Sequence, residues 1–312
     1  MPKSKRSVNA TECDFNDMKP IEVFKYPSQT SKIICDVNTN NLLQISSQII
    51  DLVKTNKVTI QMVLYLIDAF SQIRVKEVKL FTELYLKLSN EFSCIIQPRN
   101  EKLAALLHYQ GLKFENFEPK KKEEEILNIY STESPLYYIV CDKVDDLKSK
   151  FPDLDLKQMY AKELTSFDCA IKYGSELCFN YLKNLGAKYT DYSVKYAVQG
   201  GNQNIFMQMI EDGKSFHNMI NTALIYRHYE IAEYLKTNFE QTPSLTKITK
   251  SMYFGNYDVV SYLISNGADI NELYIFLHVI FINALYYLLS SQIYQCFMLF
   301  CFFSYFTLLY RI

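Results

Sequence analysis

The fold of this chain is decided by the stretch Gly255–Asn271, whose sequence is GNYDVVSYLISNGADIN. Val259 and Leu263 recur at helical spacing between two glycines, Gly255 and Gly267. Glycine accommodates the left-handed backbone of a tight turn, and it commonly follows the end of a helix. The stretch therefore predicts a short helix that begins after one tight turn and ends at another.

Three earlier segments carry the same pattern in the same phase. Each unit has a small residue in a first helix, at Ala170, Ala197, Ala223 and Ser251, with separations of 27, 26 and 28 residues. Four residues later comes the residue of the first turn, which is Gly174, Gly201, Arg227 or Gly255. Twelve residues beyond it comes the residue of the second turn, which is Gly186, Gly213, Phe239 or Gly267. Only the third unit departs from glycine, so we expect a series of stacked helix pairs.

A weaker unit precedes these four, between Leu136 and Phe151. Ser134 and Pro135 indicate its beginning, because serine caps helices and proline favours the first helical position.

The units resemble ankyrin repeats. The segment Thr165–Ala170, TSFDCA, is similar to the ankyrin signature T-P-L-H-x-A, and Gly255–Asn271 is similar to an ankyrin second helix with its exit. More specifically, the arrangement resembles the protist ankyrin family that carries a DUF3447-type region of degenerate repeats. The resemblance implies an α-solenoid over residues 134–272 that binds a protein partner through an extended concave surface.

The units are shorter than the ankyrin period of about 33 residues, and the loss falls between units, for example between Gly186 and Tyr192. That gap holds the projecting finger of an ankyrin repeat, so we expect contacts from helix faces. The resemblance implies that the concave side carries a candidate partner-contact surface, at Lys172, Tyr173, Gln199, Ile225, Tyr226, Tyr253 and Phe254. The alternative is that these aromatic residues only fill the space left by missing fingers.

The remaining N-terminal segments have different characters. Residues 1–40 mix charged and small polar residues without a period, which indicates a tail or irregular lead-in. Residues 41–116 contain four apolar stripes at helical spacing, which predict a small helical domain. Residues 117–133 include balanced lysine and glutamate runs, which are typical of a solvated linker.

The composition indicates no catalytic chemistry. The net charge of -1 gives no bulk attraction to nucleic acid, and the eight cysteines form no paired metal-binding motif. The four histidines lie far apart, and Gly200–Asn202 lacks the lysine of a phosphate loop. We therefore predict no enzyme, no cofactor, no metal, no small-molecule substrate and no nucleic acid.

After Glu272 the composition changes abruptly, because residues 273–310 contain no Lys, Arg, Asp or Glu. Residues 293–310 form an apolar run near the lower limit for a membrane span. Three interpretations of residues 273–312 remain: a C-terminal membrane anchor, an apolar cap on the last unit, or a frame-shifted end of a truncated ankyrin array.

Together these patterns predict an all-α chain: an N-terminal helical segment, an ankyrin-like solenoid and a hydrophobic C-terminal helical segment. The expected function is a non-enzymatic scaffold for protein–protein interaction, inside the cell, with cytoplasmic repeats and a membrane tether through residues 273–310. The alternative from another class is an integral membrane protein with accessory cytoplasmic repeats.

Overall fold

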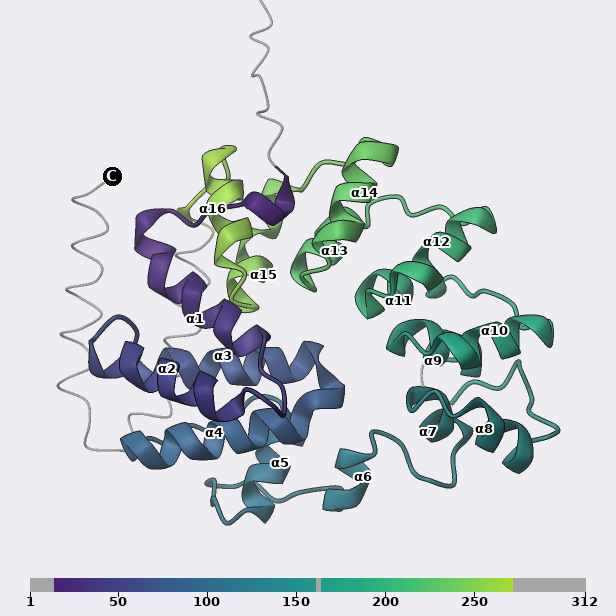
Figure 1. The fold of residues 1–312 in the computed structure, drawn as a ribbon, viewed down its shortest axis with the longest axis horizontal. Coiled ribbons are helices and arrows are strands. Elements are labelled where there is room, and N and C mark those ends of the chain that lie inside the picture. The colour runs from purple at the N-terminus through teal and green to yellow at the C-terminus, as the bar shows by residue number, and fades with distance from the viewer. Residues whose placement is uncertain (1–13, 161–163, 272–312) are drawn as a thin grey trace, which may run out of the picture.

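A computed structural model describes residues 14–160 and 164–271 of the chain (Figure 1). These residues form α-helices and short 3-10 helices and contain no β-strand. The prediction of an all-α chain is therefore confirmed for the described part. The expected hydrophobic helical segment, residues 273–312, lies outside the described residues.

The first five helices form a bundle with its own hydrophobic core. They are α1 (Lys25–Cys35), α2 (Leu42–Lys54), α3 (Ile60–Ile73), α4 (Val78–Phe92) and α5 (Glu101–Tyr109). Their apolar stripes meet in a core that includes the fully buried residues Ile34, Ile49, Phe70, Phe81 and Leu88. Thr59 caps α3 and Asn100 caps α5 through their side-chain oxygens. We call α1–α5 the bundle.

The segment expected to be a tail or irregular lead-in is helical from residue 15 onward. It contains the 3-10 helices η1 (Phe15–Asp17) and η2 (Glu22–Phe24) and the helix α1. The buried residues of α1 are mostly small and polar, at Ser28, Thr30, Ser31 and Ile34. Because this buried face is mostly polar, the sequence shows no apolar stripe that would predict the helix.

The segment expected to be a solvated linker also contributes to the core. Helix α6 (Glu123–Leu127) lies within it, and its Ile126 side chain is buried against the bundle. The three glutamates of α6 occupy its first turn, where the helix dipole favours negative charge.

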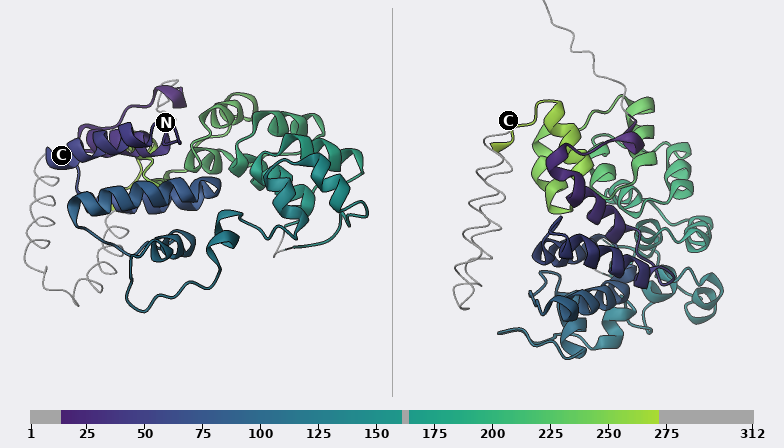
Figure 2. Two further views of the ribbon diagram at one scale, coloured as in Figure 1. Left: turned by 60° about the horizontal axis from the view of Figure 1, so that its bottom comes forward. Right: turned by 60° about the vertical axis from the view of Figure 1, so that its left-hand side comes forward.

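Five helix pairs follow the bundle in an arc, which we call the helix row (Figures 1 and 2). The first helices are α7 (Pro135–Val140), α9 (Ser166–Tyr173), α11 (Ser193–Gly200), α13 (Ile220–Ile225) and α15 (Ile248–Tyr253). The second helices are α8 (Val144–Lys150), α10 (Glu176–Asn184), α12 (Gln203–Glu211), α14 (Tyr229–Phe239) and α16 (Tyr257–Ser265). The predicted cap of α7 is confirmed, with Ser134 at the N-cap and Pro135 in the first turn.

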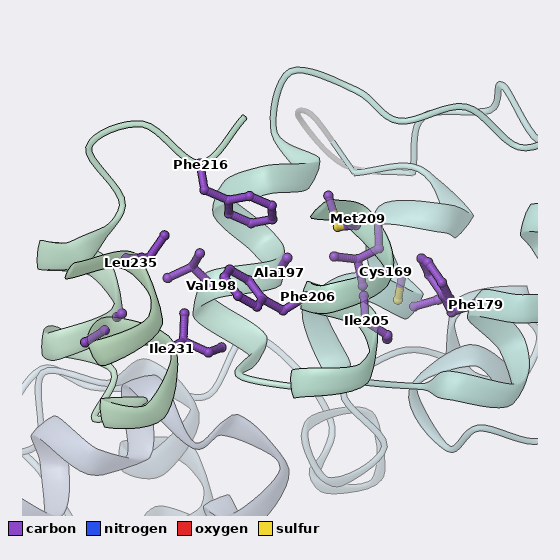
Figure 3. Close-up of a cluster of buried hydrophobic side chains, with 14 of the residues drawn as sticks. Cys169, Phe179, Ala197, Val198, Ile205, Phe206, Met209, Phe216, Ile231 and Leu235 are labelled. Atoms are coloured by element: carbon purple, nitrogen blue, oxygen red, sulfur yellow. The ribbon is translucent and has the colours of Figure 1, made fainter. Parts of the chain in front are cut away.

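The first helices of neighbouring pairs pack side by side along the row, with α9 against α7 and α11, and α13 against α11 and α15. The small residues Ala170, Ala197, Ala223 and Ser251 are all buried between them. Aromatic and aliphatic side chains of both helices in each pair complete a continuous core (Figure 3). Phe206, for example, packs its ring against Phe216 at 4.6 Å between centroids.

The turn inside every pair takes a left-handed backbone at the same position. Its residues are Asp142, Gly174, Gly201, Arg227 and Gly255, with φ between 54° and 70°. Arg227 therefore adopts the glycine conformation although it carries a side chain, which is uncommon for such a residue. The second turn of the same unit differs from the sequence expectation, because its left-handed residue is Glu240 rather than Phe239.

The bundle and the helix row pack directly on each other. Tyr257 of α16 belongs to the core of the bundle, and Phe15 of η1 belongs to the core of the row. The ring of Tyr257 lies 5.4 Å from that of Phe24, and the ring of Phe15 lies 5.7 Å from that of Tyr262, measured between centroids. We call this contact the seam.

Within residues 14–160 and 164–271, no helix is both long enough and apolar enough to cross a membrane.

Candidate functional site

The seven residues of the candidate partner-contact surface lie at the C-terminal ends of first helices. Lys172 and Tyr173 end α9, Gln199 is in the last turn of α11, Ile225 and Tyr226 end α13, and Tyr253 and Phe254 end α15. Ile225 is buried and the other six are half-buried. The shared position brings them to one face of the helix row, and we call it the inner face.

The bundle covers the inner face at its C-terminal end, where Tyr253 lies. The Tyr65 hydroxyl on α3 donates to the carbonyl oxygen of Tyr253 at 3.1 Å, and the Gln72 amide donates to the Tyr253 hydroxyl at 3.0 Å. The rings of Tyr65 and Tyr253 meet edge to face, with centroids 5.9 Å apart. Tyr253 therefore packs against another part of the same chain.

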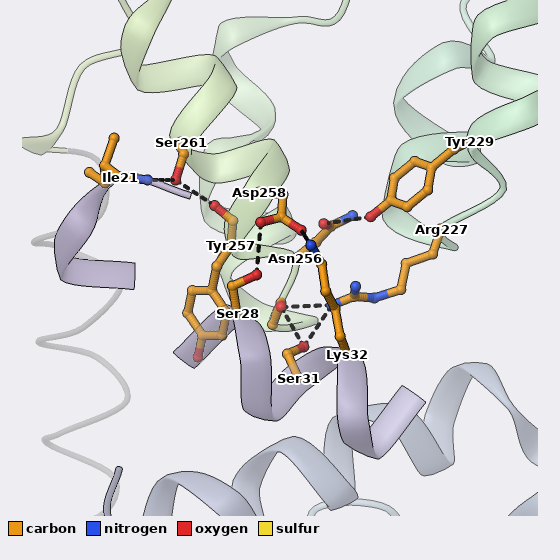
Figure 4. A network of polar contacts seen from close by, with 11 residues as sticks. Ile21, Ser28, Ser31, Lys32, Arg227, Tyr229, Asn256, Tyr257, Asp258 and Ser261 are labelled. Atoms are coloured by element: carbon orange, nitrogen blue, oxygen red, sulfur yellow. Dashed lines mark hydrogen bonds and ion pairs between the residues drawn. The ribbon is translucent and has the colours of Figure 1, made fainter. Parts of the chain in front are cut away.

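Arg227, in the turn between α13 and α14, joins the helix row to the bundle (Figure 4). Its Nη2 donates to Ser31 Oγ of α1 and to the Gly255 carbonyl, both at 2.7 Å. Its guanidinium also lies over the ring of Phe70 of α3, 5.1 Å from the centroid. One side chain thus contacts two bundle helices and the following turn of the row.

Helix α1 binds α16 through a buried carboxylate. Asp258 accepts a hydrogen bond from Ser28 Oγ at 2.7 Å and an ion pair from Lys32 Nζ at 2.8 Å (Figure 4). Nearby, the backbone N–H of Ile21 donates to Ser261 Oγ at 3.0 Å. These bonds satisfy polar groups that burial would otherwise leave unpaired.

A ladder of hydrogen bonds runs between neighbouring pairs of the row. The residue after the first turn donates to the preceding unit: Asn202 Nδ2 to the Gly174 carbonyl at 3.3 Å, and Asn256 Nδ2 to the Leu224 carbonyl at 2.6 Å. His228 Nε2 lies 3.0 Å from the Gln199 carbonyl in the same register. These residues were not predicted from the sequence, although their shared phase at 202, 228 and 256 could have identified them.

The surroundings of His228 shift the pKa of its imidazole. Burial lowers the pKa of the imidazole below its usual value of 6.5, and the hydrogen bond to Gln199 only partly opposes this. The ring also fills the space beside Gly201, where an added Cβ would lie 2.0 Å from His228 Cε1. This histidine is therefore part of the packing between units.

Asp168 of the ankyrin-like signature makes a second contact between units. Its fully buried carboxylate accepts hydrogen bonds from the hydroxyls of Thr165, Thr190 and Ser193. Thr165 is also the N-cap of α9, since its Oγ1 accepts from the Asp168 N–H at 3.1 Å. The signature thus fixes its own helix and the start of the next unit.

Lysines surround the other end of the inner face, where Lys172 and Tyr173 lie. Lys76 Nζ donates to the Tyr173 carbonyl at 2.9 Å. The ring of Tyr173 meets that of Tyr130 edge to face at 6.2 Å, and their hydroxyls are 3.5 Å apart. Burial lowers the pKa of Lys172 and raises the pKa of Tyr173 to about 12.

The described residues include no group of three or more His, Cys, Asp or Glu side chains that could hold a metal ion. Cys169 and Cys178 are buried in the row, and burial raises the pKa of the Cys178 thiol to about 12. Thiols in such surroundings stay protonated at neutral pH and pack as small apolar groups.

An open depression of about 680 Å³ lies between α1 and α2. Its lining mixes acidic, basic, amide and aliphatic side chains, and no cluster of like chemistry converges in it.

Comparisons of the chain with protein-family models, with curated proteins and with solved structures find no match.

Proposed function

We propose that this chain is a non-enzymatic scaffold for protein–protein interaction, built on an ankyrin-like α-solenoid of shortened repeats. The observation that carries the proposal is the left-handed turn at the same position of all five helix pairs, including Arg227. Units that share one turn geometry and stack through equivalent residues form a continuous array, and such arrays present extended binding surfaces.

Hydrogen bonds between units support this assignment. Asn202, His228 and Asn256 each reach back to a carbonyl of the preceding pair. The same position therefore performs the same task in three successive units, as expected where each repeat depends on its neighbours for stability.

In this proposal, the contact between the bundle and the helix row limits which part of the inner face serves a partner. Tyr253 is occupied by Tyr65 and Gln72 of α3, so its role in this proposal is to hold the bundle in place. Lys172, Tyr173 and Gln199 lie at the other end of the face, on α9 and α11. We place the partner-contact region there.

The proposal includes an intracellular location and a membrane tether through residues 273–310. This part rests on the composition of those residues alone, and they lie outside the described chain.

Affinity capture with the full-length chain as bait, in its native cells, tests the proposed function. Gln199→Glu adds a negative charge to the partner-contact region at nearly the same side-chain size, whereas Lys87→Ala alters an exposed residue of α4. We expect at least one protein to be enriched by the wild-type chain and by Lys87→Ala, and to be lost from Gln199→Glu. Equal enrichment by all three baits would contradict the proposed location, and no enriched protein would contradict the function.

A further inference from the structure

Three elements bring lysines that lack a carboxylate partner together beside the α9–α11 end of the inner face. Lys76 lies in η3 (Val75–Glu77) and Lys102 in α5, while Lys172 ends α9. Tyrosines from the segment before α7, from α9 and from α11 lie among them. We call this set the lysine–tyrosine cluster: Lys76, Lys102, Lys172, Tyr130, Tyr173 and Tyr196.

The distances show how closely Lys76 and Lys172 approach the tyrosine rings. Lys172 Nζ is 5.6 Å from the ring centroid of Tyr173 and 5.3 Å from that of Tyr196. Lys76 Nζ is 5.7 Å from the same Tyr173 centroid. The ammonium groups of Lys76 and Lys172 therefore both contact the ring of Tyr173, although like charges repel each other at this range.

Within the described chain, none of the three lysines lies within ion-pair distance of a carboxylate, whereas other lysines have such partners. Lys183 pairs with Asp212 at 2.5 Å, and Lys120 pairs with Glu101 at 3.2 Å. Glu77, which neighbours Lys76, is directed to Arg74 instead. Glu77 and Glu101, the sequence neighbours of Lys76 and Lys102, are thus engaged by other cations.

Burial makes this arrangement costly. It is the largest cause that lowers the pKa of both Lys102 and Lys172, and repulsion from Lys121 and Lys172 lowers the pKa of Lys102 further. Lys102 also lies in the first turn of α5, where the helix dipole is positive. A half-buried cation without a counter-charge is stabilised when an anion binds beside it.

We propose that the lysine–tyrosine cluster binds an acidic segment of the protein partner, a run of aspartate or glutamate side chains. This inference rests on the proposed function and adds the chemical class of the partner. The carboxylates would accept from the ammonium groups of Lys102 and Lys172, and the apolar parts of the segment would lie on the tyrosine rings.

The tyrosines favour a protein segment over a nucleic acid. Single-stranded nucleic acids bind by stacking their bases on free aromatic faces. Tyr173 already carries two lysine ammonium groups over its ring, and Tyr130 meets it edge to face. Lysine is a compact point charge that suits a single carboxylate, and tyrosine is a common anchor at protein interfaces.

The test measures the binding of fluorescein-labelled decaglutamate to the full-length chain by fluorescence anisotropy at low ionic strength. The variants are Lys102→Met and Lys172→Met, singly and together, because methionine keeps most of the side-chain volume. The control is Lys87→Met, an exposed lysine of α4 outside the cluster. Thermal unfolding of each variant verifies that it is folded.

We expect the double variant to bind decaglutamate at least about tenfold more weakly, since each lost charged hydrogen bond costs roughly a factor of ten or more. The control should stay within about twofold of the wild type, and added salt should weaken wild-type binding. Removal of two half-buried charges that lack a carboxylate partner should leave the unfolding temperature unchanged or raised.

Three results would overturn the inference: no binding by the wild type at millimolar peptide, equal binding by the double variant, or tighter binding of a ten-residue deoxythymidine oligonucleotide through the same lysines. Affinity capture with the double variant separates this inference from the proposed function. A protein that is still captured while decaglutamate fails to bind would contradict only the acidic class of partner.

Discussion

Arg227 Nη2 donates to Ser31 Oγ at 2.7 Å across 196 residues of sequence. Ser31 Oγ in turn donates to the Gly255 carbonyl at 2.6 Å, which Arg227 also contacts. An arginine in a left-handed turn thus links the bundle to two successive pairs of the helix row. The departure from glycine in the third unit is explained by this seam.

Replacement of Arg227 by glycine and by alanine distinguishes the effect of backbone strain on stability from the effect of the hydrogen bonds to the bundle. Glycine relieves the positive φ, a gain of about 1 kcal/mol, but two charged hydrogen bonds worth roughly 1.5–3 kcal/mol each are lost. We expect Arg227→Gly to lower the free energy of unfolding, and Arg227→Ala to lower it by about 1 kcal/mol more. Urea denaturation measures both, and a Gly variant as stable as the wild type would show that the seam bonds contribute nothing.

The buried carboxylate of Asp168 is expected to be essential for the contact between the α9–α10 pair and the α11–α12 pair. Asp168→Ala leaves the hydroxyls of Thr190 and Ser193 without their acceptor, so we predict a loss of about 3 kcal/mol in the free energy of unfolding. Asp145→Ala, which alters an exposed side chain of α8, should change it by less than about 0.5 kcal/mol. Equal effects of the two substitutions would refute the role of Asp168.

His228 should make stability depend on pH. Because burial lowers its pKa in the folded state, the unfolded chain binds more protons at mildly acidic pH. The contribution of His228 is fully present above its ordinary pKa of 6.5 and is lost as the pH falls below that value toward the folded-state pKa. The substitution His228→Asn introduces the residue type that occupies the equivalent positions 202 and 256. We expect it to reduce the decline of the unfolding free energy between pH 7 and pH 5. An identical decline in both proteins would rule the histidine out.

Gly200 permits the close approach of α11 to α9. A Cβ at this position would lie 2.7 Å from the Lys172 carbonyl oxygen and 2.8 Å from that of Ile171, and neither backbone atom can move easily. Gly200→Ala should therefore cost about 2 kcal/mol or more, by the mechanism of overpacking. A Cβ at Gly213 would meet no atom within 4 Å, so only the positive φ of 76° disfavours alanine there. Gly213→Ala should therefore lower the free energy of unfolding by about 1 kcal/mol. Thermal unfolding of both variants should show the larger loss at Gly200.

The sequence predicted the all-α class and the positions of the first turns because both depend on local patterns. Ala170, Ala197 and the glycines at 174 and 201 are repeated at short range, and each determines its own helix pair. The left-handed Glu240 in place of Phe239 shows the limit of this approach, because α14 extends further than its counterparts.

The seam could not be predicted from one sequence. Ser28 and Ser31 carry no apolar periodicity, so nothing in their own segment identified α1 as buried. Their partners, Asp258 and Arg227, lie about two hundred residues away and resemble ordinary surface residues in the sequence. For the same reason, the covering of Tyr253 by α3 was not foreseen.

Photo-crosslinking from two positions tests the central claim, that α3 covers the Tyr253 end of the inner face and that a protein partner binds at the α9–α11 end, where Lys76 also contacts Tyr173. Benzoylphenylalanine replaces Gln199 in one full-length protein and Tyr65 in another, and each is irradiated in native cells. We predict that the probe at 199 captures a second protein, while the probe at 65 crosslinks only within the chain, to the region of Tyr253. Capture of a partner from position 65 and none from position 199 would contradict the account.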